Sequence, residues 1–539
     1  MIARPTVVPL ALVLVASLAV RTLSALPMRQ PGFMDAHYTY VGALNLIEGR
    51  GFNDPYIWNY LDDPTGVPHP SHLYWMPLPS LVAWAGMALL GPSYRAGQVG
   101  FILLSSLLPL VTYFIARRIS DQSRHALLAG LVTAFSGFYL RFWVSPESAT
   151  PFALAGSLTL LALGLALESN RALWFAVAGA AAGLAYLSRS DGLLFLLIAL
   201  PLPWLVAPHA SRLTPHVSRT AYCVLCLVLF LAAFFAVTGP WFYRNWVATG
   251  APVASGGLQT LWLRTYDELY SYGRVLTPET YLAWGWGNIL RSKLRIVADN
   301  LMTVVAVDGL IFAFPLALVG LWSLRRRRLY WPFLLYAPLL WLTMTVAFTY
   351  PGWRGGLLHS SAAWLPFLFP AAMVGLDRCI AWAVRRRRTW RVRQASQAFG
   401  VGVVLLAAML SGVVYWQRVL GGSLSDPAWN KSDLVYRDVG AWLEEHAAPA
   451  DLVMINNPPS FYYHTGRFSI VVPAEDPETL VEVCDRYGVR FVVLDHNIVG
   501  ALVPLYQGRA VHPRLVERAR LERSEKRPVI IYELLGVGL

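Results

Sequence analysis

The sequence predicts a polytopic α-helical membrane protein that ends in a small extracytoplasmic α/β domain. Of its 539 residues, 56% are hydrophobic and only 14% are charged, whereas a soluble globular protein has about 25% charged residues. The mean hydropathy is +0.48, and the apolar residues come in blocks of about 20, the length that crosses a bilayer. These observations exclude a soluble enzyme, a disordered chain and a fibre.

Eleven apolar blocks predict about eleven transmembrane helices. The blocks lie at 7–26, 96–116, 125–144, 148–168, 171–188, 192–207, 220–238, 300–324, 329–350, 358–384 and 399–420. We interpret the first as an anchor, with a cleaved signal peptide as the alternative. A further block, 78–90, carries prolines at its start and is too short to span comfortably. It is expected to lie at the outer surface, as a juxtamembrane or re-entrant segment.

Basic residues decide the orientation. The chain has a net charge of +13, and residues 421–539 hold 12 basic and 16 acidic side chains, which leaves 32 basic and 15 acidic ones for residues 1–420. If 78–90 does not cross, four basic clusters share one side: Arg117, Arg118 and Arg124; Arg212 and Arg219; Arg325 to Arg328; Arg385 to Arg393. The positive-inside rule then places the N-terminus in the cytoplasm and the tail outside the plasma (inner) membrane. We interpret the excess of positive charge as basic loops beside the anionic inner leaflet of the membrane, and not as a surface that binds nucleic acid.

The domain prediction is a membrane domain of residues 1–420 and an extracytoplasmic α/β domain of residues 421–539. Two outer loops, 27–95 and 239–299, are rich in polar and aromatic residues. In the tail, strands are expected at Asp451–Asn456, Phe468–Val472, Arg490–Leu494 and Pro528–Leu534, and helices at Asp433–His446, Pro477–Tyr487 and Pro513–Glu522. The tail lacks a phosphate loop and a nucleophile elbow, so the chemistry is expected on the outer face of the membrane domain.

Two acids are the first candidates for chemistry. Asp35 follows the first span in PGFMDAHY, near the start of a short amphipathic helix, and an N-cap is the alternative interpretation. Glu147 lies between two prolines in SPESATP, at the outer end of a span, and it too could cap the next helix. Asp308 lies inside the eighth span, where a carboxylate is expensive; Arg21 is its expected partner if it is buried.

Three arginines join these acids at the outer ends of other helices. Arg189 lies two residues before Asp191, and an interfacial ion pair is the plainer interpretation of the two. Arg244 follows a helix break at GPWFYRNW, and Arg354 lies in PGWRGG. Guanidinium groups bind phosphate well. The pattern therefore indicates carboxylates for proton or metal work beside arginines for an anion.

The ordered motifs resemble the GT-C glycosyltransferases, and within them the protein O-mannosyltransferase and lipid A aminoarabinose transferase group (family 39-like enzymes). The first matching feature is Asp35 after the apolar first helix. The others follow in chain order: EGRGF at 48–52, HPSHLYWMPLPSL at 69–81, SPESATPF at 145–152, YLSRSDGLL at 186–194, GPWFYRNWVATGAPV at 239–253 and NNPPSFYYHTGR at 456–467. The resemblance covers essentially the whole chain. It departs from the group where Ala36 follows Asp35 and where Ser71 follows His69-Pro70.

The resemblance implies an inverting transferase that uses a polyprenyl-phosphate-linked sugar at the outer face. It assigns Asp35 as general base on the acceptor, which is a lipid, a glycan or a protein. Because the leaving phosphate is stable as an anion, one carboxylate suffices, unlike in glycosidases. The other expected site residues are Glu147 as second catalytic acid, Arg244, Arg354 and Arg189 for the donor phosphate, and His37, His69, His72 and Asp191 for acceptor or sugar. A divalent cation is possible, with Asp35 and Glu147 as its ligands.

Two other functions stay open at this point. The first is an oligosaccharyltransferase-like GT-C enzyme acting on Asn, although the tail shows no Trp-Trp-Asp-type motif. The second is a transporter or flippase without enzymatic activity. That alternative predicts two similar halves and charges across the midplane, and the sequence shows no repeat.

Overall fold

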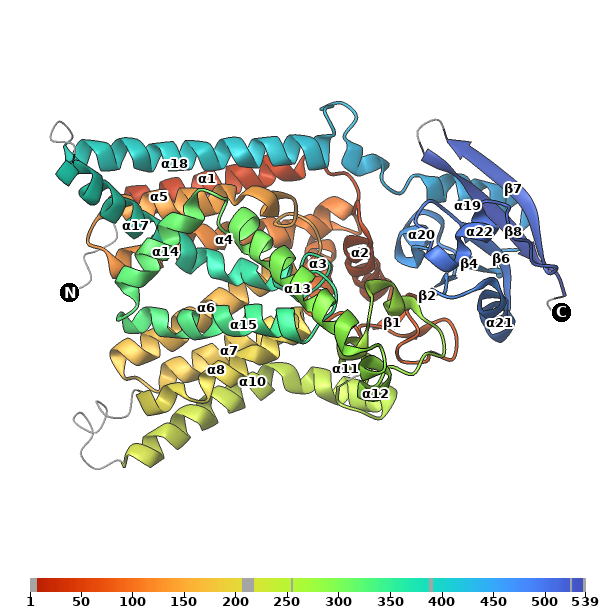
Figure 1. Ribbon diagram of the computed structural model, residues 1–539, viewed down its shortest axis with the longest axis horizontal. Helices are drawn as coiled ribbons and strands as arrows, with labels where there is room; N and C mark the ends of the chain where they lie inside the picture. The colour runs from red at the N-terminus through yellow and green to blue at the C-terminus, as the bar shows by residue number, and fades with distance from the viewer. Residues whose placement is uncertain (1–6, 206–217, 254, 387–390, 524–525, 537–539) are drawn as a thin grey trace.

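The computed structural model describes residues 7–205, 218–253, 255–386, 391–523 and 526–536. A bundle of long helices occupies one end of the long axis, and an α/β domain occupies the other (Figure 1). Short elements of the two large outer loops fill the zone between these parts, so this zone contains most of the polar residues that the sequence analysis selected.

Among the described residues, seven helices are long and apolar enough to cross a membrane on their own. They contain α1 (Val7–Ala25), α4 (Tyr94–Ile119), α6 (Ala149–Ser169), α10 (Arg219–Thr249), α15 (Trp331–Val346), α17 (Leu365–Arg386) and α18 (Val392–Tyr415). An eighth span is formed if Trp286–Asp308 and Ala313–Leu324, which meet at 91°, count as one bent pair. These segments are α13 (Trp286–Met302), its π-helical continuation η5 (Thr303–Asp308), and α14 (Ala313–Leu324). The polytopic helical fold class is confirmed.

Three of the eleven predicted spans are shorter helices. They correspond to α5 (Ser123–Phe135), α7 (Leu173–Ser188) and α8 (Leu194–Ala199). The 78–90 block forms α3 (Leu78–Leu90), a helix of 13 residues. It packs on α4 and on α2 (Met34–Ile47) of the first outer loop, as expected of a block too short to span.

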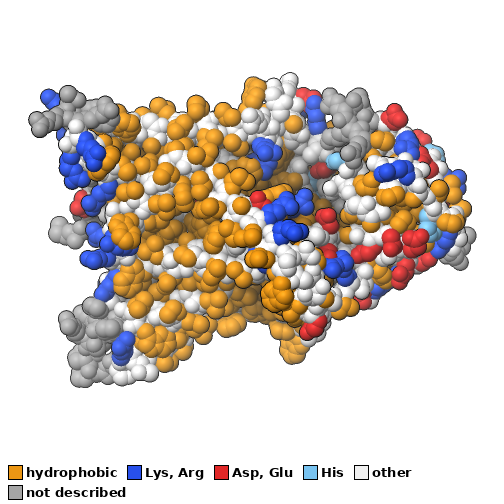
Figure 2. All heavy atoms as spheres, in the orientation of Figure 1, with side chains coloured by type: hydrophobic (Ala, Val, Ile, Leu, Met, Phe, Trp, Pro, Cys, Tyr) orange, Lys and Arg blue, Asp and Glu red, His pale blue; other side chains and the backbone are white. Residues whose placement is uncertain are grey.

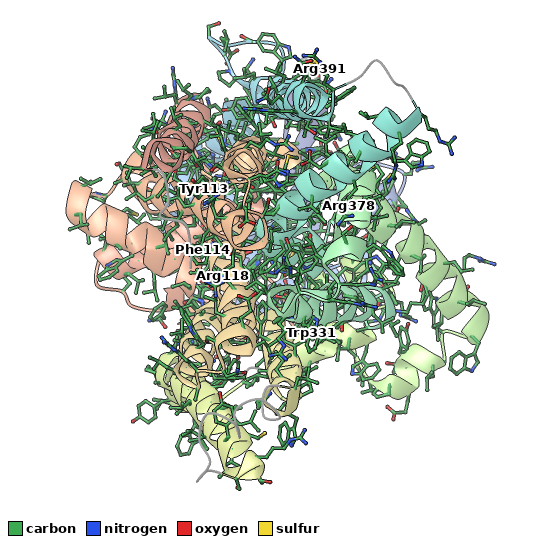
Figure 3. The ribbon with its side chains drawn as sticks, turned by 90° about the vertical axis from the view of Figure 1, so that its left-hand side faces the viewer. Tyr113, Phe114, Arg118, Trp331, Arg378 and Arg391 are labelled. Carbon is green, nitrogen blue, oxygen red and sulfur yellow. The ribbon has the colours of Figure 1, made fainter. Side chains whose placement is uncertain are left out.

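The side chains on the surface also distinguish the helix bundle from the rest of the molecule. Large apolar side chains such as Leu231, Trp322 and Leu405 are exposed on the helices, and hydrophobic side chains cover most of that part (Figure 2). Such a surface is stable when lipid covers it. Arg118, Arg378 and Arg391 lie at the end opposite the tail (Figure 3). Arg212 and part of the Arg385 to Arg393 cluster lie outside the described residues.

The tail domain is built on a mixed six-stranded sheet of order β2-β5-β4-β6-β8-β7. Strands β4 (Leu452–Ile455), β5 (Ser469–Val471) and β6 (Val489–Leu494) are parallel neighbours, and β8 (Lys526–Leu534) is antiparallel to β6. The helices are α19 (Val435–His446), α20 (Pro458–Thr465), α21 (Pro477–Tyr487) and the short α22 (Val503–Tyr506). Four predicted strands and two predicted helices are present.

The helix predicted at Pro513–Glu522 is wrong, because this segment is strand β7 (Leu515–Arg523), antiparallel to β8. Its Leu, Glu, Arg and Ala residues favour a helix locally, but pairing with the neighbouring strand overrides a weak propensity.

The first outer loop takes part in the tail sheet. Its strand β2 (Tyr56–Ile57) pairs in parallel with β5, with Tyr56 opposite Ser469 and Ile57 opposite Ile470. Two further short strands of the loop, β1 (Asn53–Asp54) and β3 (His69–Pro70), pair with each other. The buried Tyr60 hydroxyl donates to the carbonyl of Val471. The first loop therefore connects the membrane helices to the tail and fixes the position of α2.

Candidate functional site

Asp35 lies in the first turn of α2, where the helix leaves the membrane domain. Phe33 is the N-cap residue and no side chain caps the helix, so the alternative interpretation of Asp35 as an N-cap is wrong. The positive end of the helix dipole still favours a carboxylate at this position. In the described part of the chain, the Asp35 carboxylate accepts no hydrogen bond and makes no ion pair. It is a half-buried acid that lines a cavity on each side.

The pKa of Asp35 is raised above its ordinary value, first of all by burial. Nearby charges modify this effect: Glu147 raises the pKa further, whereas His359 and Arg189 lower it. A general base works best when its pKa is close to the operating pH. Burial and the second acid thus move Asp35 in the direction that base catalysis requires.

Glu147 is buried against His359. Its Oε1 accepts the backbone N–H of Ala149 at 2.9 Å, at the start of α6, and its Oε2 lies 3.1 Å from Nδ1 of His359. The side chain is 1% exposed. The expected capping role is therefore present, and it is combined with a contact to the histidine that acts on Asp35.

Arg189 follows α7 directly and contacts α16 (Gly356–Ser360) and the residue before α6. Its Nη1 donates to the Ser148 hydroxyl at 3.1 Å and its Nε donates to the Ser360 hydroxyl at 3.2 Å. The Nε also lies 3.3 Å from Oδ1 of Asp191, and Ser360 donates to the other oxygen of Asp191. The predicted ion pair is present, and it belongs to a partly buried polar network rather than to a solvated surface.

Arg189, Asp191, Arg354 and His359 line one cavity together with Asp35. This first cavity has a volume of about 130 Å³. Arg354 lies over the rings of Tyr266 and Trp353, at 5.1 and 5.2 Å from their centroids, and its side chain is 46% exposed. Two guanidinium groups and one free carboxylate therefore face the same small space.

A second cavity, of about 420 Å³, lies against the same residues. Asp35, Tyr266, Arg354 and His359 line both cavities. Asp35 therefore borders two adjoining cavities, an arrangement that suits a reaction between two bound substrates.

Besides Glu147, four predicted site residues lie in neither cavity. Arg244 donates to the carbonyls of Ser71 and Phe52, at 2.9 and 2.6 Å, and so supports the first outer loop. His69 is hydrogen-bonded to the Tyr56 carbonyl and His72 to Ser80. Burial lowers the pKa of His69, and it lowers the pKa of His72 to about 3. The binding roles expected of Arg244, His69 and His72 stay predictions, and the contacts described above support the fold of the first outer loop.

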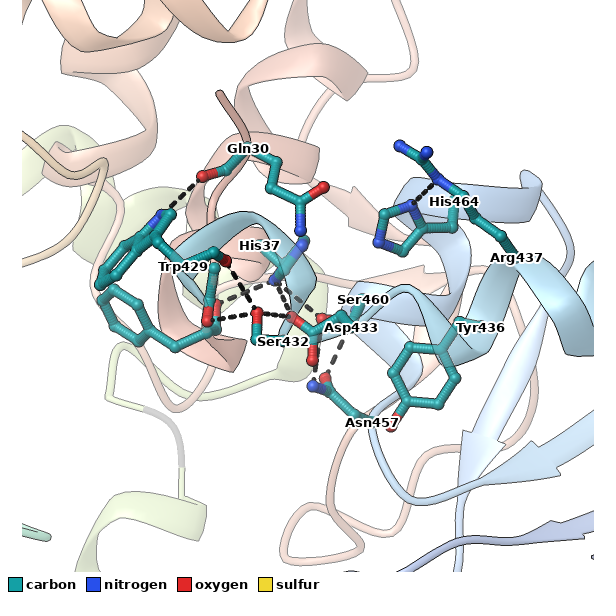
Figure 4. A network of polar contacts seen from close by, with 12 residues as sticks. Gln30, His37, Trp429, Ser432, Asp433, Tyr436, Arg437, Asn457, Ser460 and His464 are labelled. Atoms are coloured by element: carbon teal, nitrogen blue, oxygen red, sulfur yellow. Dashed lines mark hydrogen bonds and ion pairs between the residues drawn. The ribbon is translucent and has the colours of Figure 1, made fainter. Parts of the chain in front are cut away.

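His37, the fourth of these residues, lies at the junction with the tail (Figure 4). Its Nδ1 lies 2.7 Å from the Ser460 hydroxyl and 3.6 Å from the Asp433 carboxylate. Burial lowers its pKa to about 3. We attribute to His37 a role in docking the tail on α2.

Asp308 is buried in the bundle, as predicted, but Arg21 is not its partner. Tyr139 and Ser361 donate to Oδ1 of Asp308, at 2.8 and 3.0 Å. Arg21 donates to the carbonyls of Ala134 and Thr133. The bend after η5 brings Asp308 to the start of α17, away from α1.

The described residues contain no group of three or more His, Cys, Asp or Glu side chains arranged to hold a metal ion. The divalent cation at Asp35 and Glu147 stays a prediction, and the proposed reaction does not depend on it.

Three charged residues of the site were not singled out from the sequence as site residues. His359 lies close to Arg354 in the sequence and carried no signal of its own. Arg141 lies inside the predicted span 125–144, where a charged residue is unusual, and this signal could have identified it. Arg418 carried no signal, because it lies close to the end of the last span, where arginine is common.

The chain is similar in sequence, over part of its length, and in fold to membrane glycosyltransferases. Residues 68–239 match the family model described as dolichyl-phosphate-mannose-protein mannosyltransferase. This confirms the resemblance noted from the motifs, and it supports an enzyme over a transporter. A search of curated protein sequences finds no match.

Solved structures of two enzymes share the fold over nearly the whole chain. ArnT from Cupriavidus metallidurans, bound to undecaprenyl phosphate, has a TM-score of 0.56 at 13% identity, covering 100% of both chains. The Archaeoglobus fulgidus oligosaccharyltransferase AglB, in complex with an inhibitory peptide and a dolichol-phosphate, has a TM-score of 0.54 at 14% identity, covering 91% of this chain and 69% of AglB.

Proposed function

We propose that the protein transfers a sugar from a polyprenyl-phosphate donor to an acceptor hydroxyl, with Asp35 as general base. The observation that carries this proposal is the unpaired Asp35 carboxylate between two cavities, with its pKa raised by burial. The lipid phosphates bound to ArnT and AglB support the donor class.

The reaction is a single displacement. Asp35 takes the proton of the acceptor hydroxyl while the oxygen attacks the anomeric carbon. The bond from that carbon to the phosphate oxygen breaks, and the electron pair leaves with the polyprenyl phosphate. Attack opposite the leaving group inverts the anomeric configuration. Phosphate leaves as a stable anion, so no second proton donor is needed.

The donor phosphate is assigned to the first cavity. Arg189 and Arg354 line it, and a fixed guanidinium stabilises the charge that grows on a leaving phosphate. Arg189 is held by Ser148 and Ser360, so little reorganisation is needed as the charge develops. Glu147 acts indirectly, by holding His359 beside Asp35.

We place this site on the extracytoplasmic side. Basic side chains gather at the end of the bundle opposite the tail, and acidic ones gather on the tail (Figure 2). The positive-inside rule places the basic end in the cytoplasm, together with the N-terminus. The donor is then a lipid-linked sugar presented at the outer leaflet.

The decisive experiment compares wild type and Asp35→Asn in vesicles supplied with a labelled polyprenyl-phosphate sugar. Loss of a general base predicts a fall in kcat of about 10²- to 10⁴-fold, with donor affinity retained. Asp426→Asn is a matched control, because Asp426 is 64% exposed and pairs with Lys431. Full transfer by the Asp35→Asn variant would refute the assignment of the base.

An oligosaccharyltransferase-like reaction on an Asn side chain is the second candidate, favoured by the fold shared with AglB. Vesicles offered a peptide acceptor and a hydroxyl acceptor in parallel would separate the two, since label on the peptide amide supports only the second.

A further inference from the structure

The second cavity on Asp35 carries charges that the proposed reaction does not use. Besides Arg354, which also lines the first cavity, Arg141 and Arg418 line it, and the aromatic rings of Phe33, Phe142, Trp353 and Trp429 form much of its wall. Arg141 ends the turn η1 (Gly137–Arg141) after α5, and Arg418 lies in the π-helical turn η8 (Trp416–Leu420) after α18. Two helix ends, far apart in the sequence, thus bring guanidinium groups to one space.

Arg141 is the more buried of these groups. Its guanidinium lies 4.4 and 4.5 Å from the ring centroids of Phe138 and Phe142. Its Nε is buried and has no hydrogen-bond partner in the described part of the chain. A buried donor without a partner costs free energy, and a buried cation without one costs more. Such an arrangement suits a group that a ligand completes.

The neighbouring charges do not neutralise Arg141. Arg418 acts on it as a like charge, and the acid that acts on it is Glu147. Glu147 is already engaged by Ala149 and His359. Arg418 itself is exposed and makes no ion pair within the described ranges. Two cations that face one cavity repel each other until an anion lies between them.

We propose that this second cavity binds a phosphate group of the acceptor, so that the acceptor is a phosphorylated molecule. Arg141 and Arg418 bind the phosphate, and the aromatic wall covers the part next to it. The acceptor hydroxyl then reaches Asp35 from the second cavity, while the donor occupies the first. The proposal rests on the proposed function for the role of Asp35, but not for the anion site itself.

The test is direct binding to the full-length protein in nanodiscs, measured by calorimetry. The probes are N-acetylglucosamine 1-phosphate, as a soluble phosphate, and dihexanoyl phosphatidic acid, as a lipid phosphate. Each is paired with its phosphate-free counterpart, N-acetylglucosamine or dihexanoylglycerol. We expect at least one phosphate probe to bind, and the probe that binds more tightly identifies the source of the phosphate.

Arg141→Gln and Arg418→Gln should each weaken that binding about tenfold or more. Arg391→Gln, at the opposite end of the α18 segment (Figure 3), should leave it unchanged. Because Arg418 is exposed, its substitution keeps the test valid if Arg141→Gln fails to fold. Equal affinity in wild type and both variants overturns the proposal.

A transfer assay separates this inference from the proposed function. We expect the donor KM to be unchanged in Arg418→Gln, while the acceptor KM rises. A rise in the donor KM alone would make the second cavity part of the donor site and overturn the inference. Loss of phosphate binding in both variants would support the anion site even if Asp35→Asn kept full transfer activity.

Discussion

The two acids predicted to be catalytic, Asp35 and Glu147, lie in opposite surroundings. Asp35, in the first turn of α2, is half-buried and makes no hydrogen bond or ion pair among the described residues, and its pKa is raised. Glu147, just before α6, is almost completely buried and is held by the Ala149 N–H and by His359. The same functional group is left free in one region and is in close contact with its neighbours in the other.

This difference separates reaction from positioning. A carboxylate that must take a proton needs a free lone pair and a pKa near the working pH, and both properties cost folding free energy. A carboxylate that orients its neighbours needs saturated contacts, which stabilise the fold. We therefore assign the chemistry to Asp35 and the positioning of His359 to Glu147, although both acids were expected from the sequence to be catalytic.

Replacing Glu147 by Gln is the strongest test of the contrast between Asp35 and Glu147, and it should give the largest effect. The variant keeps an acceptor for the Ala149 N–H but loses the charge beside His359. We expect a loss of about 1–2 kcal/mol in stability and a fall of about 10- to 100-fold in kcat, measured by thermal unfolding and vesicle transfer. Glu168→Gln, which removes an acid that pairs with Arg118, is the control. A stable Glu147→Gln variant with normal kcat would contradict the positioning role.

Arginine replacements extend the comparison to the donor side. Arg189→Gln removes a guanidinium from the first cavity, and a lost charge-assisted contact predicts a fall in kcat/KM of about 10- to 100-fold. Arg244→Gln removes a residue bonded to the Ser71 and Phe52 carbonyls. It should lower the unfolding temperature and leave the donor KM unchanged. If Arg244→Gln instead raised the donor KM as Arg189→Gln does, the original sequence expectation for Arg244 would be restored.

The contrast also shows what the sequence could predict. Apolar blocks and basic clusters are local signals, so the helices and the tail strands were predictable, whereas β7 was not, because its pairing partner decides its structure. Asp35, Glu147, Arg189 and Arg354 were found because each lies at a predicted helix end. The separation of Arg244 and the histidines from the cavities, and the meeting of Arg141 with Arg418, depend on long-range packing that one sequence does not display.

The pH profile gives a smaller but signed effect. Because the raised pKa of Asp35 must be exceeded for it to act as base, kcat/KM should fall on acidification at a pH above the ordinary Asp range. His359→Gln removes a group that lowers this pKa, so the acid limb should move to higher pH. Glu147→Gln removes a group that raises it, so the limb should move to lower pH. Shifts in the same direction for both variants would exclude Asp35 as the titrating group.

The smallest expected effect is on the stability of the folded protein, through the ionised carboxylate of Asp35. A folded-state pKa that is raised means that the native protein binds the Asp35 proton more tightly than the unfolded chain does. The ionised carboxylate therefore destabilises the fold as pH rises above the ordinary Asp value. Asp35→Asn removes this cost, so the variant should unfold at a slightly higher temperature than wild type at neutral pH. The gain should be at most about 1 kcal/mol because the side chain is partly solvated, and it should vanish near pH 3. A catalytically dead variant that is also less stable at neutral pH would show that Asp35 makes a stabilising contact, and the contrast with Glu147 would fail.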